Sequence, residues 1–388
     1  MSNQAGSIKK LNKAEFGRIM ENMEFRKKAE LHDADNPYLP LDMGLFLTGR
    51  CNLRCKHCFE WNDDGFLKND STGHAMREIP IEKLEECLEY TRPAKTRLYL
   101  WGGEPLVYSH FHELCELLKK DPRWTTICTN GLLVENHLED ILDISENLVL
   151  LISLDGIREC NDAIRGEGTF DRVVSNIRMM KELAREGKFK GEISVCCVIS
   201  DDMVGRLYDY CEFMETLDIN TLYLSFPWYI SPETAQEMDA EFEKRFGDII
   251  EIEDYSRASW HDFTFRVSDE KVAALKGDLQ KIANKRWNIR VRLQPTLETE
   301  EIDDFIAGGS MTAQKRSKCL APFNRMDILQ DGEVSPCKLF REFRVGNIGD
   351  ESIKDIWEGK RMAEMRKRLS CGLLPACSKC VLLYLNGE

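Results

Sequence analysis

Three cysteines within eight residues constrain what this chain can fold into more than any other feature. Cys51, Cys55 and Cys58 follow the apolar run 45–47, which places them on a loop that leaves a buried strand. Thiolates select zinc or iron–sulfur centres, and three of them can hold three irons of a [4Fe–4S] cluster while the fourth iron stays open. A structural zinc site remains an alternative, although zinc uses four closed ligands.

The composition predicts an ordinary globular protein. A length of 388 residues with 43% hydrophobic residues is enough for two or three domains with substantial cores. The net charge of −14 repels phosphate backbones and anionic lipid, so neither nucleic acid nor a membrane is an expected partner. No apolar run reaches the ~18 residues of a membrane span.

Fifteen cysteines without an N-terminal apolar signal indicate reduced thiols and a cytoplasmic location. Some of these thiols are expected to bind metal. The others stand at apparent helix or strand positions, where they are predicted to be buried small hydrophobes: Cys87, Cys115, Cys128, Cys160, Cys196, Cys197 and Cys211.

Short apolar runs alternate with amphipathic segments through the first two thirds of the chain. The predicted strands are 44–48, 97–101, 124–129, 148–154, 193–199 and 219–226. The predicted helices lie near 80–92, 110–120, 134–143, 171–187 and 201–216. This alternation indicates parallel βαβ units and a sheet that is buried on both faces.

Polar and glycine-rich turns follow four of these strands at the same end. They are the cysteine loop, residues 102–105 (Gly-Gly-Glu-Pro), residues 129–131 (Thr-Asn-Gly) and residues 153–156 (Ser-Leu-Asp-Gly). Because ligands bind at the carboxyl ends of parallel strands, the four turns predict one mouth.

The remaining segments suggest a division of the chain into four parts. Residues 1–42 are expected to form a helical extension, since 11–30 has one apolar face; we expect this helix to pack on the main domain, with partner binding as the alternative. A domain at 43–226 is followed by a linking segment at 227–310 and a cysteine-rich domain at 311–388. The linking segment is predicted to contain helices and a strand: 232–246, 268–286 and 289–293.

A second group of cysteines occurs in the last 70 residues. It consists of Cys319, Cys337, Cys371, Cys377 and Cys380. Asp331-Gly332 is a hairpin signal just before Cys337, and a helix is predicted from 352 to 369. A hairpin together with the late Cys-x2-Cys pair can close a metal site, and either zinc or a fully ligated [4Fe–4S] cluster fits it.

Residues 43–226 resemble the radical S-adenosylmethionine (SAM) superfamily in two motifs. These are Cys-x3-Cys-x2-Cys at Cys51, Cys55 and Cys58, and Gly-Gly-Glu at 102–104. The resemblance implies an α/β fold, a partial (β/α)6 TIM-like barrel. It also implies a [4Fe–4S] cluster that is held by the three cysteines and binds SAM at its open iron.

The C-terminal part is similar to the SPASM/Twitch extension of that superfamily, through Cys319, Gly332 and Cys337. This similarity implies one auxiliary [4Fe–4S] cluster on four thiols: Cys319, Cys337, Cys377 and Cys380. The late cysteines stand as Cys-x5-Cys-x2-Cys, which is fewer than a second auxiliary cluster requires and leaves Cys371 as a spare thiol.

The resemblance also implies roles at the SAM site. Glu104 would accept hydrogen bonds from the SAM amino group, and the glycines before it would allow close backbone approach. The other implied contacts are to the ribose and carboxylate for Ser153, Asp155 and Arg165, and to the adenine for His57 and Val198. The implied cofactor-binding set is therefore Gly102, Gly103, Glu104, Ser153, Asp155, Arg165, His57 and Val198.

The implied activity is reductive SAM cleavage to a 5′-deoxyadenosyl radical that abstracts hydrogen from a substrate, with an external one-electron reductant such as flavodoxin or ferredoxin. Residues 153–170 are similar to peptide-modifying members, with Asn161-Asp162 where a His-Asp pair is usual. Oxidative modification, cross-linking or epimerisation of a peptide is therefore expected. The alternatives are a dehydrogenase or epimerase of a small polar metabolite, and a non-catalytic zinc- or iron-binding scaffold.

Overall fold

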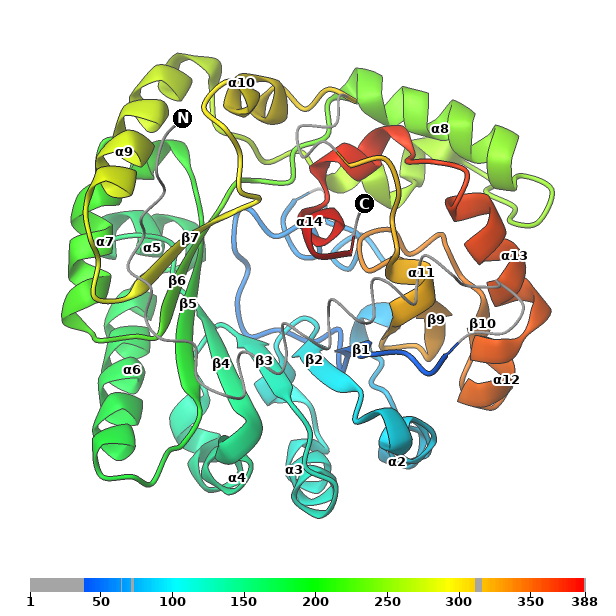
Figure 1. Ribbon diagram of the computed structural model, residues 1–388, viewed down its shortest axis with the longest axis horizontal. Coiled ribbons are helices and arrows are strands. Elements are labelled where there is room, and N and C mark those ends of the chain that lie inside the picture. The colour runs from blue at the N-terminus through cyan, green and yellow to red at the C-terminus, as the bar shows by residue number, and fades with distance from the viewer. Residues whose placement is uncertain (1–37, 64, 71–72, 311–315, 387–388) are drawn as a thin grey trace.

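The computed structural model describes residues 38–63, 65–70, 73–310 and 316–386, and an open barrel of parallel strands forms its centre (Figure 1). The helix predicted at 11–30 lies outside the described residues. The strands are β1 (Asp42–Phe46), β2 (Arg97–Trp101), β3 (Thr125–Thr129), β4 (Leu148–Ser153), β5 (Glu192–Val198), β6 (Thr221–Ser225), β7 (Arg290–Gln294), β8 (Arg325–Ile328), β9 (Glu333–Ser335) and β10 (Gly346–Asn347).

One sheet contains all ten described strands in the order β10-β9-β8-β1-β2-β3-β4-β5-β6-β7. The neighbours from β8 through β1 to β7 are parallel, whereas β9 and β10 continue the sheet as antiparallel strands. The six predicted strands are therefore confirmed as β1 to β6. The strand predicted at 289–293 is confirmed as β7, which the structure places beside β6, and the structure adds β8 from the C-terminal part beside β1.

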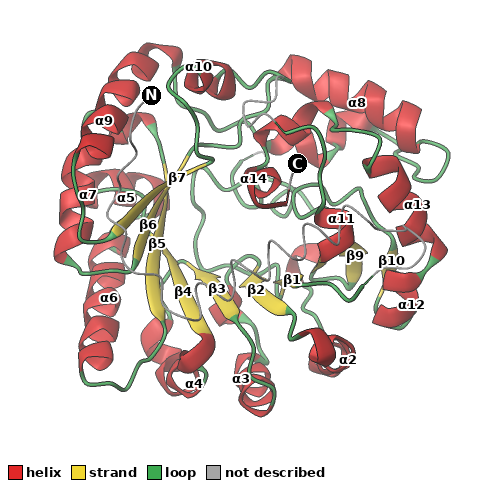
Figure 2. Cartoon of the chain, viewed as in Figure 1, coloured by secondary structure: helices red, strands yellow, loops and turns green. Residues whose placement is uncertain are grey.

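Helices cover the convex face of the curved sheet, which Figure 2 shows for α2, α3, α4, α6 and α7. The helices are α2 (Ile81–Thr91), α3 (Phe111–Lys120), α4 (Leu138–Asp143), α5 (Arg158–Arg165), α6 (Thr169–Arg185), α7 (Leu207–Thr216), α8 (Pro232–Phe246), α9 (Val272–Asn284), α10 (Glu301–Ile306), α11 (Ala321–Asn324), α12 (Ile353–Glu358), α13 (Lys360–Leu369) and α14 (Val381–Asn386). The helix predicted at 352–369 is divided at Gly359 into α12 and α13. None of the described helices is both long and apolar enough to cross a bilayer.

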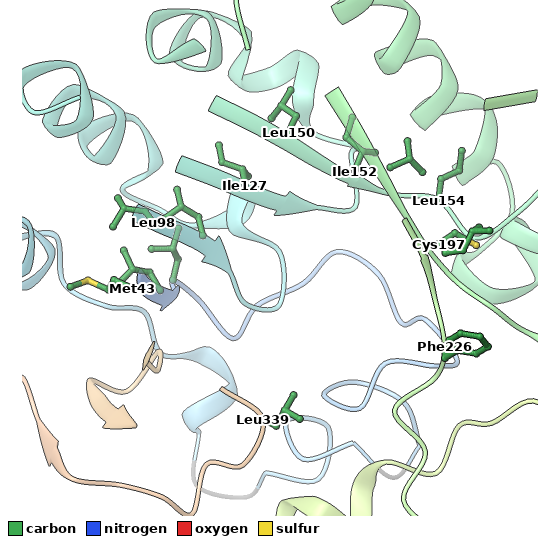
Figure 3. Packing of buried hydrophobic residues seen from close by; sticks show 14 of the residues in the cluster. Met43, Leu98, Ile127, Leu150, Ile152, Leu154, Cys197, Phe226 and Leu339 are labelled. Atoms are coloured by element: carbon green, nitrogen blue, oxygen red, sulfur yellow. The ribbon is translucent and has the colours of Figure 1, made fainter. Parts of the chain in front are cut away.

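A row of aliphatic side chains crosses the sheet at one level. Strand register pairs Leu45 with Leu100, Leu100 with Ile127, Ile127 with Leu150, and Leu150 with Ile193. All five are buried, and Figure 3 shows Ile127 and Leu150 on neighbouring strands of this core. Burying such side chains stabilises the fold by about 1.5–3 kcal/mol each.

The other face of the sheet lines a cavity of about 2100 Å³. Side chains that alternate with the core row point into it, among them Tyr99, Cys128, Ser153 and Cys196. The expectation of a sheet buried on both faces is therefore wrong, because the barrel is open and its inner face is available to ligands. Cys128 and Cys196 are half-buried on this face, whereas the other five cysteines predicted as core residues are buried: Cys87, Cys115, Cys160, Cys197 and Cys211.

A buried arginine fastens the C-terminal part to the barrel. Arg366 donates hydrogen bonds to the carbonyl oxygens of Pro322 (3.0 Å) and Trp357 (2.9 Å), and its guanidinium lies over the Trp357 ring. The Trp357 indole in turn donates to the carbonyl oxygen of Tyr38, just before β1. These contacts hold β8 and the helices after it against the first strand.

Gly44 supplies a test of the unpredicted β8 pairing. Its position on β1 faces Asp327 on β8, and a Cβ at Gly44 would lie 1.7 Å from the Asp327 Oδ1 that Arg325 holds in a bidentate pair. We expect Gly44→Ala to lower the free energy of unfolding by about 1–3 kcal/mol, because overpacking forces the pair apart. Urea unfolding followed by circular dichroism measures the change.

Gly277→Ala is the control for this prediction. Gly277 lies in α9, and a Cβ there would have open space within 4 Å, so alanine should raise the free energy of unfolding by up to about 1 kcal/mol. Equal stability of Gly44→Ala and the native chain would contradict the β1–β8 register.

Candidate functional site

The cysteine loop and the Gly-Gly-Glu loop are held together by backbone hydrogen bonds. The Gly103 amide donates to the carbonyl oxygen of Thr48 (2.9 Å), and the Glu104 amide donates to that of Arg50 (2.9 Å). The loop that follows β2 therefore lies directly against the residues that precede Cys51.

This close approach requires glycine at both positions. Gly102 has φ 143°, and a Cβ there would lie 2.6 Å from the Thr48 carbonyl oxygen. A Cβ at Gly103 would lie 2.3 Å from the Arg50 carbonyl oxygen. Both contacts are with backbone, which cannot move aside as a side chain can, so any larger residue would separate the two loops.

Glu104 is buried at the edge of the cavity with both carboxylate oxygens engaged. One oxygen accepts from the Thr129 hydroxyl (2.6 Å) and the Leu106 amide (3.1 Å), and the other accepts from the Asn130 amide (2.7 Å). Burial raises the pKa of Glu104, and these hydrogen bonds oppose that rise. The Asn130 side chain also donates to Asn52 (2.7 Å), so the turn after β3 is tied to the cysteine loop.

Asp155, after β4, joins three parts of the site through its carboxylate. Oδ2 accepts from Arg165 Nε (2.6 Å) and contacts His57 Nε2 (2.6 Å), while Oδ1 accepts from the Val198 amide (2.7 Å). Burial alone would raise the pKa of Asp155, but Arg165 and His57 hold it below its usual range. Asp155 is fully buried and does not line the cavity, whereas Arg165, His57 and Val198 do.

The three thiols of the first group all line the cavity. Burial raises the pKa of Cys51 to about 12 and also raises those of Cys55 and Cys58, while Arg165, 3.9 Å from the Cys55 sulfur, lowers that of Cys55. Buried thiols of this kind become thiolates when a metal replaces the proton, because a coordinated thiol is deprotonated outright.

The chemistry of this donor set fits an iron–sulfur cluster. Each cluster thiolate binds a different iron, so the ligands surround the cluster and do not converge on one ion. Among the described residues, no three His, Cys, Asp or Glu side chains are arranged to hold a single metal ion.

Four thiols of the second group lie close enough to affect one another. Burial raises the pKa values of Cys337, Cys377 and Cys380 to about 12, and that of Cys319 well above its usual value. Cys377, Cys380 and Cys337 each raise the pKa of Cys319 further. The structure thus brings together the four cysteines that the sequence grouped as one auxiliary site.

Cys371 stands apart from this group. It is exposed just after α13, and its sulfur contacts the Lys367 carbonyl oxygen at 3.4 Å.

Lys379 lies between the last two cysteines and fixes the position of their turn. It donates hydrogen bonds to the carbonyl oxygens of Asp304 and Phe305, which hold the Cys-x2-Cys turn against α10.

Aromatic rings form one wall of the cavity. The Phe59 ring stacks on Phe263 with centroids 4.9 Å apart and on Trp228 with centroids 6.0 Å apart, and all three line the cavity. The structure thus places Trp228 in the pocket wall beside them. The sequence did not single out Phe59 or Phe263, which belong to no motif.

Three cavity residues on β2 could have been found from the sequence. Strand 97–101 alternates inward-facing Arg97, Tyr99 and Trp101 with outward-facing Leu98 and Leu100, which is the signal of a strand with one polar face. The Lys338 side chain reaches the same region, 3.8 Å from the Tyr99 ring centroid. Nothing in its local sequence indicates that contact.

Comparison with known families gives two matches. Residues 45–211 match the radical SAM superfamily, and residues 319–381 match the SPASM iron–sulfur cluster-binding domain.

Similar proteins span most of the chain. A tungsten-containing aldehyde ferredoxin oxidoreductase cofactor-modifying protein of Pyrococcus furiosus is 23% identical over 87% of this chain and 86% of its own length. The subtilosin biosynthesis protein AlbA of Bacillus subtilis is 22% identical over 90% of this chain and 69% of its own. The crystal structure of Streptococcus suis SuiB bound to precursor peptide SuiA shares the fold, with a TM-score of 0.58 and 14% identity over 89% of this chain and 70% of that one. The chain thus contains a radical SAM domain and a C-terminal SPASM domain, and these domains imply SAM, a [4Fe–4S] cluster and auxiliary iron–sulfur clusters as its cofactors.

Proposed function

We propose that this enzyme modifies a peptide by abstracting a hydrogen atom from it inside the barrel. One observation carries the proposal: a single cavity of about 2100 Å³ is lined by the three thiols, by Glu104 and Arg165, and by a wall of aromatic rings. The reagents and the substrate would therefore meet in one place.

In this proposal, Cys51, Cys55 and Cys58 hold the [4Fe–4S] cluster that binds SAM. Bound together and reduced, cluster and SAM supply a 5′-deoxyadenosyl radical that removes hydrogen from substrate. The chain's own part is to position the two groups. The glycine contacts fix the Gly-Gly-Glu loop against the cysteine loop, so Glu104 faces the thiols at a set place.

Other cavity residues would contact the carboxylate, ribose and adenine of SAM. Arg165 lies beside Cys55 and would pair with the SAM carboxylate. Ser153 would meet the ribose, and His57 and Val198 would meet the adenine, since all three line the cavity near that pair. Asp155 would act as a positioning residue, because it holds Arg165, His57 and Val198 without reaching the cavity itself.

The second thiol group would hold one auxiliary [4Fe–4S] cluster on Cys319, Cys337, Cys377 and Cys380. Its site borders the cavity, because Lys338 and Val381, each next to one of these cysteines, line it. A cluster there could accept an electron from the substrate after hydrogen abstraction. An external one-electron reductant such as flavodoxin or ferredoxin would supply an electron to the first cluster.

The form of the cavity favours a peptide over a small metabolite. Its volume of about 2100 Å³ exceeds the roughly 300–1,000 Å³ of ordinary small-molecule pockets, although the cluster and SAM would occupy part of it, and β7, at the end of the sheet order, borders it. The names of the B. subtilis and S. suis proteins also refer to peptide products or substrates. The P. furiosus relative is named for cofactor modification, which keeps a small-molecule substrate as the second candidate.

Anaerobic reconstitution with iron, sulfide and SAM tests the function. We expect reductant-dependent 5′-deoxyadenosine, together with a mass change in a peptide from a library of synthetic peptides, because abstraction precedes the modification. Cys55→Ala should abolish both products, since it removes a ligand of the first cluster. Stimulation of 5′-deoxyadenosine by metabolite extract but by no peptide would contradict the peptide substrate, and zinc binding without SAM cleavage would contradict the enzyme.

Iron content tests the number of clusters. We expect about eight irons per native chain and about four in Cys377→Ala, because the second site loses one of four ligands. Cys371→Ala is the matched control and should keep the native iron content, since that thiol is exposed, unlike the four of the group. Loss of about four irons from Cys371→Ala would instead indicate a second auxiliary cluster.

Asp155→Asn tests the positioning role. The change keeps the shape of the side chain but removes the charge that orients Arg165, so we expect the dissociation constant for SAM to rise about tenfold or more and the free energy of unfolding to fall by about 3–5 kcal/mol. Equilibrium dialysis of the reconstituted protein measures the first quantity. Asp171→Asn, which breaks an exposed pair with Arg158, should leave SAM binding unchanged. Native SAM affinity in Asp155→Asn would show that the carboxylate has only a structural role.

A further inference from the structure

We propose that Lys338 and Trp101 form a binding subsite for a carboxylate of the substrate, and that this carboxylate is the acidic side chain of a peptide. The inference rests on the proposed peptide-modifying function and extends it to the class of residue that the cavity recognises. It is carried by two hydrogen-bond donors that share one corner of the cavity and have no acceptor among the described residues.

The corner lies between the two thiol sites. Trp101 ends β2 and is followed directly by the Gly-Gly-Glu loop, whereas Lys338 directly follows Cys337. The Lys338 Nζ atom lies 3.8 Å from the Tyr99 ring centroid and 4.6 Å from that of Trp101. All three side chains line the cavity, so the ammonium group is presented to it on an aromatic surface.

The Trp101 indole is a buried hydrogen-bond donor. The residue is 8% exposed, and its Nε1 atom has no acceptor within the residues that the structure describes. Leaving a buried donor unsatisfied costs about 1–3 kcal/mol, and an acceptor brought by a ligand would recover this free energy. The indole N–H can only donate, so the missing group is an acceptor.

Lys338 is the second donor. Within the described part of the chain it forms contacts with aromatic rings but neither an ion pair nor a hydrogen bond. Three arginines of the cavity region are already matched: Arg325 pairs with Asp327, Arg97 with Asp42, and Arg165 with Asp155. At this corner, a bound anion would therefore meet the positive charge of Lys338.

The charged and thiol groups that act on Lys338 come from four other elements. They are Arg325 and Asp327 on β8, Cys128 on β3, Cys380 at the auxiliary site, and Glu60 after the cysteine loop. Arg325 and Asp327 neutralise each other. Glu60 is a buried carboxylate that interacts with Lys338 without an ion pair within 4.0 Å, so it leaves the ammonium open to a closer acceptor.

A carboxylate would supply one acceptor oxygen for each donor, and a small shift of the indole ring would bring its buried N–H to the ligand. The two carboxylate oxygens can accept from the Lys338 ammonium and the Trp101 indole, and charge-assisted hydrogen bonds of this kind are about twice as strong as neutral ones. The aromatic surroundings lower the local dielectric and strengthen the attraction. An acidic residue anchored here would hold the neighbouring part of a peptide between the thiol group at Cys51 and the auxiliary thiols.

Matched peptide pools test the subsite. The protein is reconstituted anaerobically with iron, sulfide and SAM, and its binding of random decapeptides that contain glutamate is compared with that of pools in which glutamine replaces glutamate. We expect the native enzyme to prefer the glutamate pool by about tenfold. Lys338→Gln should abolish the preference, and Trp101→Phe, which keeps the ring but removes the N–H, should reduce it about threefold.

The controls separate this proposal from the function on which it rests. Lys354→Gln changes an exposed lysine on α12 and should keep the full preference. Native iron content and 5′-deoxyadenosine release in Lys338→Gln, together with loss of the preference, would support the subsite. Absence of SAM cleavage in the native protein would count against the proposed function alone, because the binding assay needs no turnover.

Three outcomes would overturn the subsite. The first is a native enzyme that does not discriminate between the pools, and the second is a preference that survives in both Lys338→Gln and Trp101→Phe. If Lys338→Gln fails to load iron, Trp101→Phe decides the question by itself, and an unchanged preference there overturns the proposal. The third is displacement of the glutamate pool by N-acetylglutamate amide at the same concentration, which would show a site for small acids and not for peptides.

Discussion

The site depends on one buried carboxylate. Removing an ionised carboxylate from water costs several kcal/mol unless partners compensate it, and the partners of Asp155 come from three different elements: the cysteine loop through His57, α5 through Arg165, and β5 through the Val198 amide. Satisfying this one group therefore fixes the relative positions of all three at the end of β4. Arg165 is placed beside the Cys55 sulfur as a result, although Asp155 itself does not reach the cavity.

A steric constraint fixes the other side of the site. The Gly-Gly-Glu loop can hydrogen-bond to the cysteine loop only because neither Gly102 nor Gly103 carries a Cβ. One side of the site is thus set by electrostatics and the other by the absence of side chains. Both operate on backbone at strand ends, where parallel strands leave their loops on one rim of the barrel.

Much of the fold and of the site could be predicted from local sequence. Strand 97–101 and helix 232–246 match the predicted bounds to the residue, because apolar runs and the helix start at Pro232 are local signals. Spacing together with the similarity to the SPASM/Twitch extension also grouped the four auxiliary cysteines, whose thiols affect one another's pKa in the structure. The pairing of β8 with β1 was not predicted, because it joins residues almost 300 positions apart and no local pattern encodes it. The cavity was missed for a related reason, since runs such as 148–154 are apolar on both faces and do not reveal which face is open.

The same limit separates reagent binding from substrate choice. SAM chemistry needs fixed spacings within one loop, so it leaves motifs that a sequence reveals. The corner at Lys338 and Trp101 requires no fixed spacing in the sequence. Lys338 comes from the cysteine-rich C-terminal part and Trp101 from β2, and the two side chains meet because β8 pairs with β1. The proposed subsite therefore puts the choice of substrate where the C-terminal part faces the barrel interior, away from the motifs that identify the chemistry.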